Sequence, residues 1–225
     1  MAIILNIETA TTNCSVSVAQ DGKLLLLKEY NSAGYSHSEK LHIFIKEALE
    51  EASLSFAELN AIAVSKGPGS YTGLRIGVSA AKGLCYSLDI PLLSIPTLVS
   101  MACKACWDGD GVVIPVLDAR RMEVYSQVFD FNYEELRETK AEIIDEFSFK
   151  EFIEKGKVLL IGSGAEKCKE VLKNADFSFD TAIVPSAKEM CGLSYTKYKL
   201  GDFENTAYFE PYYLKDFILQ KKKKL

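Results

Sequence analysis

A glycine-rich segment in the N-terminal half constrains the fold of this chain more than any other feature. The residues Gly67-Pro68-Gly69-Ser70-Tyr71-Thr72-Gly73 follow an apolar run at 58–64 and precede a helical pattern that extends to about Leu88. Glycine and proline at this density end a strand and form a tight turn, after which a helix can begin. We therefore predict a strand, a turn and a helix here, within a chain that mixes strands and helices.

The same turn is a candidate nucleotide or anion site, because backbone N–H groups at the start of a helix can hold an anion. The candidate contacts are Gly67, Gly69, Ser70 and Thr72, joined by Arg120 from a later turn. The segment lacks the Gly-Lys-Ser/Thr end of a Walker A loop and the spacing of a dinucleotide-binding loop. Close packing of the glycines in a tight turn is the alternative explanation, and the residues alone leave both open.

The first hundred residues alternate between strand and helix patterns. Apolar and alternating runs predict strands at 3–7, 14–19 and 24–27, and Asp21-Gly22 predicts a hairpin between the last two. Ser36 and Glu39 have the spacing of a capping box, and an apolar stripe follows them through residue 52. With strands at 58–64 and 91–95, the predicted order is β-β-β-α-β-α-β.

The opening pattern recurs in the second half of the chain. A polar, glycine-rich stretch near 100–111 predicts a boundary, followed by strands at 112–117, 123–129 and 158–161 and helices from about 166 and at 192–199. Glu8 and Asp118 each end a first strand just before a hairpin turn. This repeat predicts two domains of similar construction, 1–104 and 105–225, although coincidence is the alternative. The basic tail at 221–225 is predicted to be disordered.

The helix after the glycine-rich turn is predicted to be covered on two sides. One face carries larger apolar residues, and a neighbouring face carries Gly73, Ile76, Ala80 and Gly83. The sheet of its own domain covers only one face, and small residues let another helix approach closely. We therefore predict a protein interface at Ile76, Ala80 and Gly83, joined by Ile43, which lies off the apolar stripe of the preceding helix.

Charge and cysteine content limit the partners and the compartment. The formal net charge is −5, and four of the positive charges are the lysines at 221–224, so the body of the chain is a poor nucleic-acid binder on its own. No apolar run is long enough to span a bilayer, and the N-terminus does not resemble a signal peptide. The six cysteines indicate reduced thiols in the cytoplasm, with Cys103 and Cys106 interpreted as ordinary helix cysteines.

No catalytic or metal-ligating set is predicted. As a nucleophile Ser70 would need a histidine base with a carboxylate partner, and the two histidines, His37 and His42, have no evident one. Five residues apart on a helix, they point about 140° apart, so they cannot share a metal ion and are interpreted as a solvated helix face. Glu8 and Asp118 could hold Mg²⁺, but turn carboxylates that accept local N–H groups are the preferred interpretation.

The chain resembles the bacterial TsaB (YeaZ) family in segments that follow one another over most of its length. The matching segments are Ile7-Glu8-Thr9-Ala10-Thr11, Cys14-Ser15-Val16, His37-Ser38-Glu39-Lys40-Leu41, Gly67-Pro68-Gly69-Ser70-Tyr71-Thr72-Gly73-Leu74-Arg75-Ile76-Gly77, Asp118-Ala119-Arg120, Glu123-Val124-Tyr125 and Pro211-x-Tyr213-Leu214-Lys215. The glycine segment is specific, though it is partly shared with the paralogous TsaD family. The chain departs from the pattern at Glu8, where the family usually has Asp, and at Lys215, where Arg is usual. The first departure makes a Mg²⁺ site less credible, and the second keeps the charge but loses bidentate pairing.

This resemblance implies an α/β fold of the actin/Hsp70/sugar-kinase-like (ASKHA) type, with two related RNase H-like domains. It also implies a non-catalytic subunit of the complex that transfers a threonylcarbamoyl group to the adenosine next to the anticodon of tRNAs reading codons that begin with A. In that picture TsaD is the catalytic subunit, and it binds to the two N-terminal helices of this chain. TsaE, an ATPase, joins the complex of the two proteins. Without TsaD the chain forms a homodimer through the same two helices. ATP and metal then belong to the partner subunits, and tRNA is met only through the complex. The alternative is an active phosphotransferase of the same fold, such as a small sugar or acid kinase.

Overall fold

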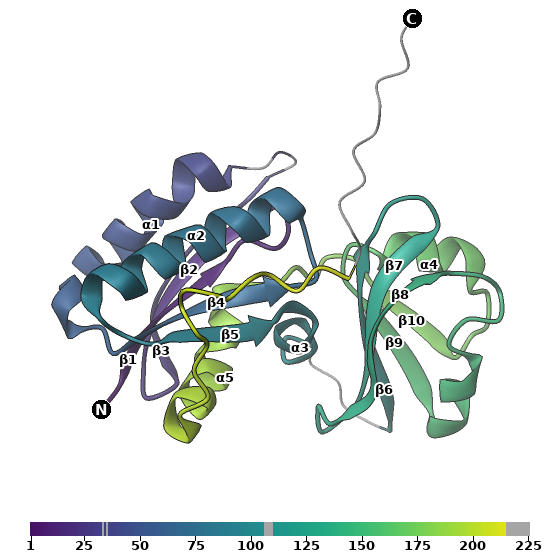
Figure 1. Cartoon of the computed structure of the whole chain (residues 1–225). Coiled ribbons are helices and arrows are strands. Elements are labelled where there is room, and N and C mark those ends of the chain that lie inside the picture. Colours follow the sequence, from purple (N-terminus) through teal and green to yellow (C-terminus); the bar gives the residue numbers. More distant parts are fainter. Residues whose placement is uncertain (33, 35, 106–109, 215–225) are drawn as a thin grey trace, which may run out of the picture.

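Two five-stranded sheets lie side by side in the computed structural model, which describes residues 1–32, 34, 36–105 and 110–214 (Figure 1). In the first sheet the strands are arranged in the order β3-β2-β1-β4-β5. Their bounds are β1 Ile3–Glu8, β2 Asn13–Gln20, β3 Lys23–Asn31, β4 Ala61–Gly67 and β5 Leu92–Pro96. The predicted hairpin at Asp21-Gly22 is confirmed, because β2 ends before it and β3 begins after it.

The second sheet repeats the topology of the first. Read from its β8 edge, its order is β8-β7-β6-β9-β10. Its strands are β6 Gly111–Asp118, β7 Glu123–Asp130, β8 Glu135–Ile143, β9 Lys157–Ile161 and β10 Phe177–Asp180. In each sheet three successive strands pair antiparallel, and the two later strands join in parallel. The recurrence of the opening pattern in the sequence therefore has a structural counterpart.

Helices cover both faces of the first sheet (Figure 1). One face is covered by α1 and α2 and the other by α5, with the bounds α1 His37–Glu51, α2 Tyr71–Leu88 and α5 Ala187–Leu200. Every side chain of β1 is buried, because successive residues point to opposite faces of a sheet that is covered on both. Leu5 and Ile7 join the core under α1 and α2, whereas Ile4 joins the core under α5.

The helix α5 lies on the first sheet, although it follows the second sheet in the chain. Its N-terminal end is hydrogen bonded to β2, because Ala187 N donates to Ser15 Oγ at 2.8 Å and Ser17 Oγ donates to Ala187 O at 2.8 Å. Met190 adds apolar contact with the same sheet. The prediction that all of 105–225 belongs to the C-terminal domain is therefore corrected for α5. The boundary at 104/105 stays a prediction, and the tail at 221–225 lies outside the described residues.

Several local details differ from the sequence patterns. The fourth strand begins at Ala61 rather than at 58, because Ser55 and Glu58 close a short 3₁₀ helix, η1 (Phe56–Glu58), ahead of it. The capping box predicted at Ser36 is wrong, since this side chain makes no cap hydrogen bond, although α1 begins at the next residue. The sequence indicated α4 (Ala165–Val171) but not α3 (Thr97–Ala102), η2 (Lys150–Lys155), β8 or β10. β8 was not predicted because it is an edge strand whose exposed positions are largely charged. Over the part of the chain that is described, no helix combines the length and apolar character needed to cross a membrane.

Candidate interaction surface

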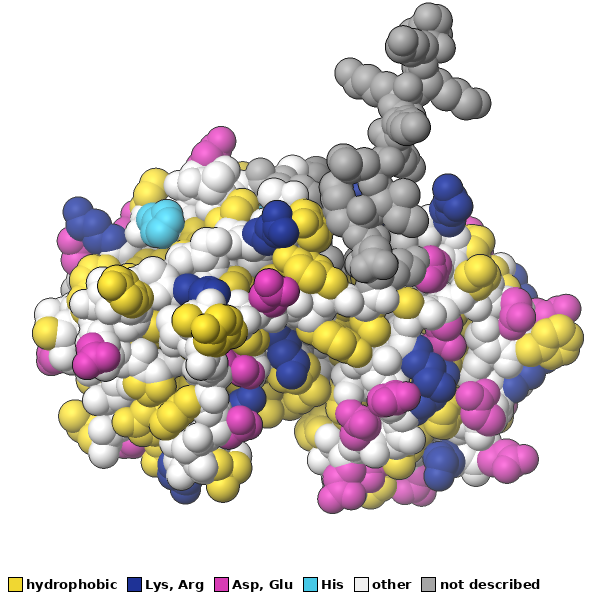
Figure 2. All heavy atoms as spheres, viewed as in Figure 1, with side chains coloured by type: hydrophobic (Ala, Val, Ile, Leu, Met, Phe, Trp, Pro, Cys, Tyr) yellow, Lys and Arg dark blue, Asp and Glu magenta, His cyan; other side chains and the backbone are white. Residues whose placement is uncertain are grey.

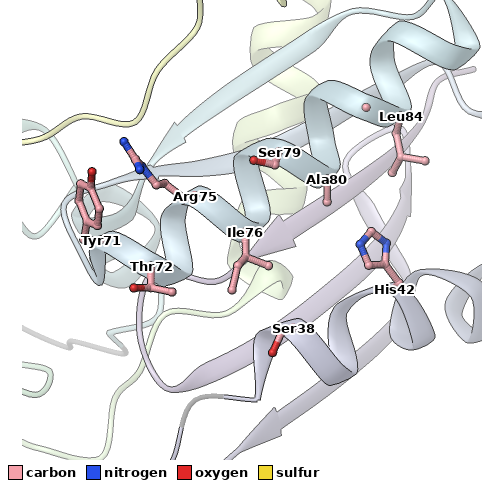
Figure 3. A pocket seen from close by; sticks show the side chains of 10 residues that line it. Ser38, His42, Tyr71, Thr72, Arg75, Ile76, Ser79, Ala80 and Leu84 are labelled. Atoms are coloured by element: carbon pink, nitrogen blue, oxygen red, sulfur yellow. The ribbon is translucent and has the colours of Figure 1, made fainter.

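We call the first sheet with its helices α1, α2 and α5 the first unit, and the second sheet with α4 the second unit. A groove runs between α1 and α2 on the face of the first unit that carries both helices (Figure 3). Its volume is about 800 Å³, and its lining residues are Ser38, His42, Tyr71, Thr72, Arg75, Ile76, Ser79, Ala80, Gly83 and Leu84. In the space-filling view, hydrophobic and neutral side chains cover this region beside an exposed histidine, whereas acidic side chains gather over the second unit (Figure 2). We call this feature the α1–α2 groove.

The α2 side of the groove is the small-residue face predicted from the sequence. Ser70 Oγ accepts a hydrogen bond from Gly73 N at 3.3 Å and so caps the start of α2. From this fixed start, Ile76 and Ala80 project toward α1 (Figure 3), and a Cβ added at Gly83 would meet no heavy atom within 4 Å. These three residues therefore share one open face, and their part in an interface stays a prediction. Gly73, predicted on the same face, is buried instead.

The α1 side of the groove is more polar. It is lined by Ser38 and His42, whereas Ile43 is 50% exposed and does not line the groove, so its part in an interface stays a prediction. The solvated position predicted for both histidines is right for His42 and wrong for His37, which is 1% exposed. The connection between β1 and β2 reaches the start of α1, so His37 Nε2 lies 2.7 Å from Thr11 O. Burial lowers the pKa of His37, which favours a neutral ring.

The glycine-rich turn packs directly on the chain just after β1. A Cβ added at Gly69 would lie 2.5 Å from Ala10 O, and Cβ atoms at Gly73 and Gly77 would overlap the carbonyl and hydroxyl oxygens of Thr9. Thr9 Oγ1 also donates a hydrogen bond to Gly73 O at 2.8 Å. These contacts support close packing as the reason for glycine at these positions.

The five residues predicted to contact an anion lie at different places in the structure. Ser70 N donates to Ala10 O at 2.6 Å and Ser70 Oγ caps α2, so both groups already have partners within the fold. Gly67 packs against the backbone near the C-terminus, Thr72 lines the α1–α2 groove, and Arg120 lies in the turn between β6 and β7 of the other sheet. Gly69 approaches the chain after β1, as described above. An anion role for these residues stays a prediction.

Glu8, at the end of β1, is fully buried. Its Oε1 accepts hydrogen bonds from Ala10 N at 2.5 Å and Ser65 Oγ at 2.9 Å, while its Oε2 has no hydrogen-bond partner among the described residues. Burial raises the pKa of Glu8 to about 7, against a smaller opposing effect of these hydrogen bonds. Mg²⁺ prefers exposed carboxylates that keep part of its water shell. A fully buried carboxyl whose pKa is raised to about 7 does not fit such a site.

Asp118, at the matching position of β6, has an exposed side chain that is already paired. Its Oδ1 accepts hydrogen bonds from Lys167 Nζ at 2.7 Å and from Arg120 N at 2.6 Å. Lys167 Nζ also donates to the carbonyl oxygens of Arg121 and Glu123, so one ammonium holds the whole turn. The interpretation of Asp118 as a turn carboxylate fits this geometry. A carboxylate neutralised by a lysine does not fit a Mg²⁺ site either.

The other described residues give little support for metal binding or for a reactive cysteine. Within residues 1–32, 34, 36–105 and 110–214, no group of three or more His, Cys, Asp or Glu side chains is placed to hold a metal ion. The described cysteines are free thiols, and burial raises the pKa of the partly exposed one, Cys103. Its predicted partner in the C-x-x-C pair, Cys106, lies outside the described residues. The expectation that the chain carries no cofactor of its own stays a prediction.

Sequence patterns missed a cluster at the N-terminal end of the groove. There Arg75 lies over the ring of Tyr71, with its guanidinium carbon 4.4 Å from the ring centroid, and Arg75 Nε donates to the hydroxyl of Tyr213 at 3.3 Å. The rings of Tyr71 and Tyr213 are 5.1 Å apart. Arg75 and Tyr213 are 138 positions apart in the chain, so no local pattern could join them. The available signal was the presence of Tyr213 in the last segment that carries the family resemblance.

Comparison with known proteins places this geometry in context. A family model described as TsaD: tRNA N6-adenosine threonylcarbamoyltransferase matches residues 31–212. The chain is 27% identical to the tRNA threonylcarbamoyladenosine biosynthesis protein TsaB of Escherichia coli (strain K12), over 97% of both chains. It is 34% identical to the Bacillus subtilis (strain 168) protein of the same name, over 54% of this chain and 53% of that one. For the Haemophilus influenzae protein of that name the identity is 26%, over 97% and 96%.

Solved structures resemble the chain over almost its whole length. YeaZ from Pseudomonas aeruginosa superposes with a TM-score of 0.79 at 23% identity, over 95% of this chain and all of that one. A second structure, of an uncharacterized protein with similarity to peptidase YeaZ from the same organism, gives a TM-score of 0.81 at 23% identity. At this identity the likeness speaks for the fold. Together with the repeated sheet topology, it confirms an α/β fold of the ASKHA type with two related RNase H-like units.

Proposed function

The chain belongs to the TsaB (YeaZ) branch of the family described as TsaD: tRNA N6-adenosine threonylcarbamoyltransferase, and from this premise we propose that it is a subunit of the complex that makes threonylcarbamoyladenosine in tRNA. In this proposal it binds and supports a catalytic TsaD subunit in the cytoplasm and does not carry out the transfer itself. TsaE is the second protein partner, and ATP and metal are bound by the partner subunits. The tRNA meets this chain only within the complex.

The α1–α2 groove is the observation that supports a partner role. Two helices lie side by side there, and the small side chain of Ala80 and the open space at Gly83 leave room for a third helix at close range. Helices pack about 8–10 Å apart, and small residues at the contact allow the shorter distances. A matching pair of helices from TsaD, or from a second copy of this chain in a homodimer, would complete a four-helix arrangement.

The alternative, a phosphotransferase of the same fold, gains no support from the strand ends. A phosphotransferase needs carboxylates that can hold Mg²⁺ beside the phosphates. Glu8 is fully buried with its pKa raised to about 7, and Asp118 is paired with Lys167. Steady ATP turnover by the isolated chain on a sugar or acid substrate would favour this alternative over the partner role.

A charged substitution in the groove tests the proposal. Ala80→Arg puts an unpaired charge and a long side chain into the groove, and burying such a charge costs several kcal/mol. We expect it to weaken TsaD binding by at least about 100-fold and to weaken the homodimer similarly, because both use the same face. Isothermal titration with purified TsaD of the same organism and size-exclusion chromatography measure the two effects.

Gly192→Arg is the matched control. Gly192 is exposed on α5, on the other face of the first sheet, and a Cβ added there would meet no heavy atom within 4 Å. The same new charge at this site should leave TsaD binding unchanged, and circular dichroism must show that both variants fold. If folded Ala80→Arg bound TsaD as well as Gly192→Arg does, the groove would not be the docking surface. If the unaltered chain failed to bind TsaD, with or without TsaE, the partner role itself would fall.

A further inference from the structure

The chain after α5, residues 201–214, lies along α2 on the side away from α1 (Figure 1, yellow). Lys82 Nζ on α2 donates hydrogen bonds to the carbonyl oxygens of Ala207 and Phe209, both at 3.0 Å. Further along, Tyr212 N donates to Lys66 O at 2.7 Å, just before the glycine-rich turn. We call residues 201–214 the C-terminal segment. These bonds fix its path from the sheet to the start of α2.

The C-terminal segment ends beside two residues of the α1–α2 groove. Tyr71 and Arg75 both line the groove, whereas Tyr213 comes from the C-terminal segment. The guanidinium of Arg75 stacks on the Tyr71 ring and is hydrogen bonded to the Tyr213 hydroxyl. In Figure 3 Arg75 rises beside Tyr71 at the end of α2 and turns away from α1, so it stands at the rim of the groove and not on its floor.

The guanidinium of Arg75 is held in place but still able to take an anion. Arg75 is exposed, and in the described part of the chain no carboxylate lies within 4.0 Å of it. The Tyr213 hydroxyl raises the pKa of Arg75, and Glu210, on the C-terminal segment, adds a weaker contribution in the same direction. Only one of the five N–H groups of the guanidinium is used by Tyr213, so the paired N–H groups that bind a carboxylate in a fork remain available.

We propose that Arg75, fixed by Tyr71 and Tyr213, is an anchor that receives a carboxylate of the docking partner, and that the C-terminal segment is thereby a third element of the docking surface beside α1 and α2. This inference rests on the proposed function, because it assumes that a protein partner occupies the α1–α2 groove. The partner helix should carry small apolar residues toward Ala80 and Gly83 and an Asp or Glu near the end that meets Arg75. An arginine held by the ring of one tyrosine and the hydroxyl of another loses little further freedom on binding, so its charge contributes more than that of a free side chain.

A protein carboxylate fits this rim better than an RNA phosphate does. The groove beside Arg75 is lined mainly by apolar and neutral side chains, and the chain as a whole carries a net charge of −5. Phosphate backbones bind where several lysines and arginines neutralise several charges together. One fixed guanidinium next to an apolar groove instead suits a helix with a single acidic residue at its end.

Association kinetics with purified TsaD test the anchor. A charge at the rim of an interface acts mainly on the association rate and on its dependence on salt. We expect Arg75→Gln to slow association about tenfold at about 50 mM salt and by much less at about 300 mM, where charges are screened. Arg75→Lys should restore the salt dependence but only part of the rate. Tyr213→Phe removes only the hydroxyl, and we expect it to slow association to a smaller extent than Arg75→Gln.

Arg121→Gln is the matched control, because it removes the same charge from an exposed turn of the second sheet. The Arg75, Arg121 and Tyr213→Phe variants should keep the melting temperature of the unaltered chain, since they alter only polar groups and leave both tyrosine rings in place. If Arg75→Gln behaved like Arg121→Gln while the unaltered chain bound TsaD, the anchor would be wrong and the proposed function would stand. If Tyr213→Phe and Tyr213→Ala had no effect while Arg75→Gln did, the C-terminal segment would not be part of the surface. A loss of tRNA binding by the assembled complex with unchanged TsaD association would identify Arg75 as a phosphate contact instead and overturn the proposal.

Discussion

Glu8 at the end of β1 and Asp118 at the end of β6 hold matching positions in two sheets of the same topology, yet they meet different surroundings. Glu8 is fully buried, and its pKa is raised to about 7. The side chain of Asp118 is 49% exposed and is bonded to Lys167. The cause lies in the helix that follows the neighbouring parallel strand in each unit. After β4 comes α2 with 18 residues, and after β9 comes α4 with 7.

The long helix closes one strand end, and the short helix leaves the other open. The glycines at the start of α2 bring its backbone against Thr9 and Ala10, which seals the end of β1. In the second unit Lys167 on α4 donates hydrogen bonds to Asp118 and to the turn between β6 and β7, and the side chain of Asp118 stays exposed. The same topology thus yields a sealed end that supports a helix surface in one unit and a charged, solvated turn in the other. This difference explains why the groove, and not the strand ends, is the candidate site.

The close packing of α2 on the end of β1 should depend strongly on glycine at position 77. A Cβ there would overlap Thr9 Oγ1, whereas a Cβ at Gly164 of the second unit would lie 3.1 Å from a side-chain methyl of Val124 and 3.2 Å from backbone. We expect Gly77→Ala to lower the free energy of unfolding by about 2–3 kcal/mol, and Gly164→Ala to lower it by about 1 kcal/mol because its neighbours need to shift only slightly. Urea unfolding measures both.

Gly83→Ala is the control within α2. Space is open at Gly83, so alanine should raise the free energy of unfolding by about 0.5–1 kcal/mol through its higher helix propensity. Equal losses at Gly77 and Gly164 would mean that the two units are closed equally tightly, and the contrast drawn between them would fail.

The free energy of unfolding should depend on pH through Glu8. The pKa of Glu8 is about 7 in the folded chain and near the ordinary value of 4.5 when unfolded. Between these values the folded chain keeps a proton that the unfolded chain loses, so the free energy of unfolding falls as pH rises from about 4.5 and the loss is complete above about 7. Each unit of difference corresponds to about 1.4 kcal/mol, so the total loss is a few kcal/mol.

Glu8→Gln removes the titration while keeping the shape of the side chain. We expect its stability to change much less between pH 5 and pH 8 than that of the unaltered chain, and to be higher at pH 8, as measured by urea unfolding at each pH. A Glu8→Gln variant with the same pH profile as the unaltered chain would show that Glu8 is ionised in the folded state.

Much of the fold was predictable from local sequence patterns, whereas the rest depends on contacts between residues that are far apart in the sequence. The hairpin at Asp21-Gly22 and the face shared by Ile76 and Ala80 were predictable, because turn chemistry and the helix repeat are properties of neighbouring residues. The burial of His37 was not, since it depends on the chain near Thr11 folding back over the ring. The position of α5 on the first sheet and the cluster around Arg75 likewise depend on contacts between residues more than a hundred positions apart.

The smallest expected effect concerns the two hairpin turns. In the first unit Asp21 and Gly22 have φ of 50° and 80°, and in the second Arg120 and Arg121 have φ of 70° and 52°. The first connection is a two-residue hairpin, which favours Asp-Gly, whereas the second is a longer turn in which Glu123 N donates to Arg120 O. In both, a positive φ favours glycine, asparagine or aspartate, because glycine has no Cβ and the other two tolerate this region. Two arginines in this conformation are strained, and the bonds from Lys167 to the turn hold them there.

Replacing both arginines, as Arg120→Asn with Arg121→Gly, should therefore stabilise the chain. Relief of strain contributes about 1–2 kcal/mol at the position that becomes glycine, with a smaller part from asparagine, and the greater freedom of glycine in the unfolded chain offsets about 0.4–1 kcal/mol of it. We expect a net gain of about 1 kcal/mol in urea unfolding. The reverse change in the first unit, Gly22→Ala, should destabilise, because φ is positive there and the new Cβ would lie 3.1 Å from the ring of Tyr195. If the paired arginine substitutions lost stability instead, the arginine side chains themselves would be contributing to the turn, and the contrast between a relaxed and a strained hairpin would have to be withdrawn.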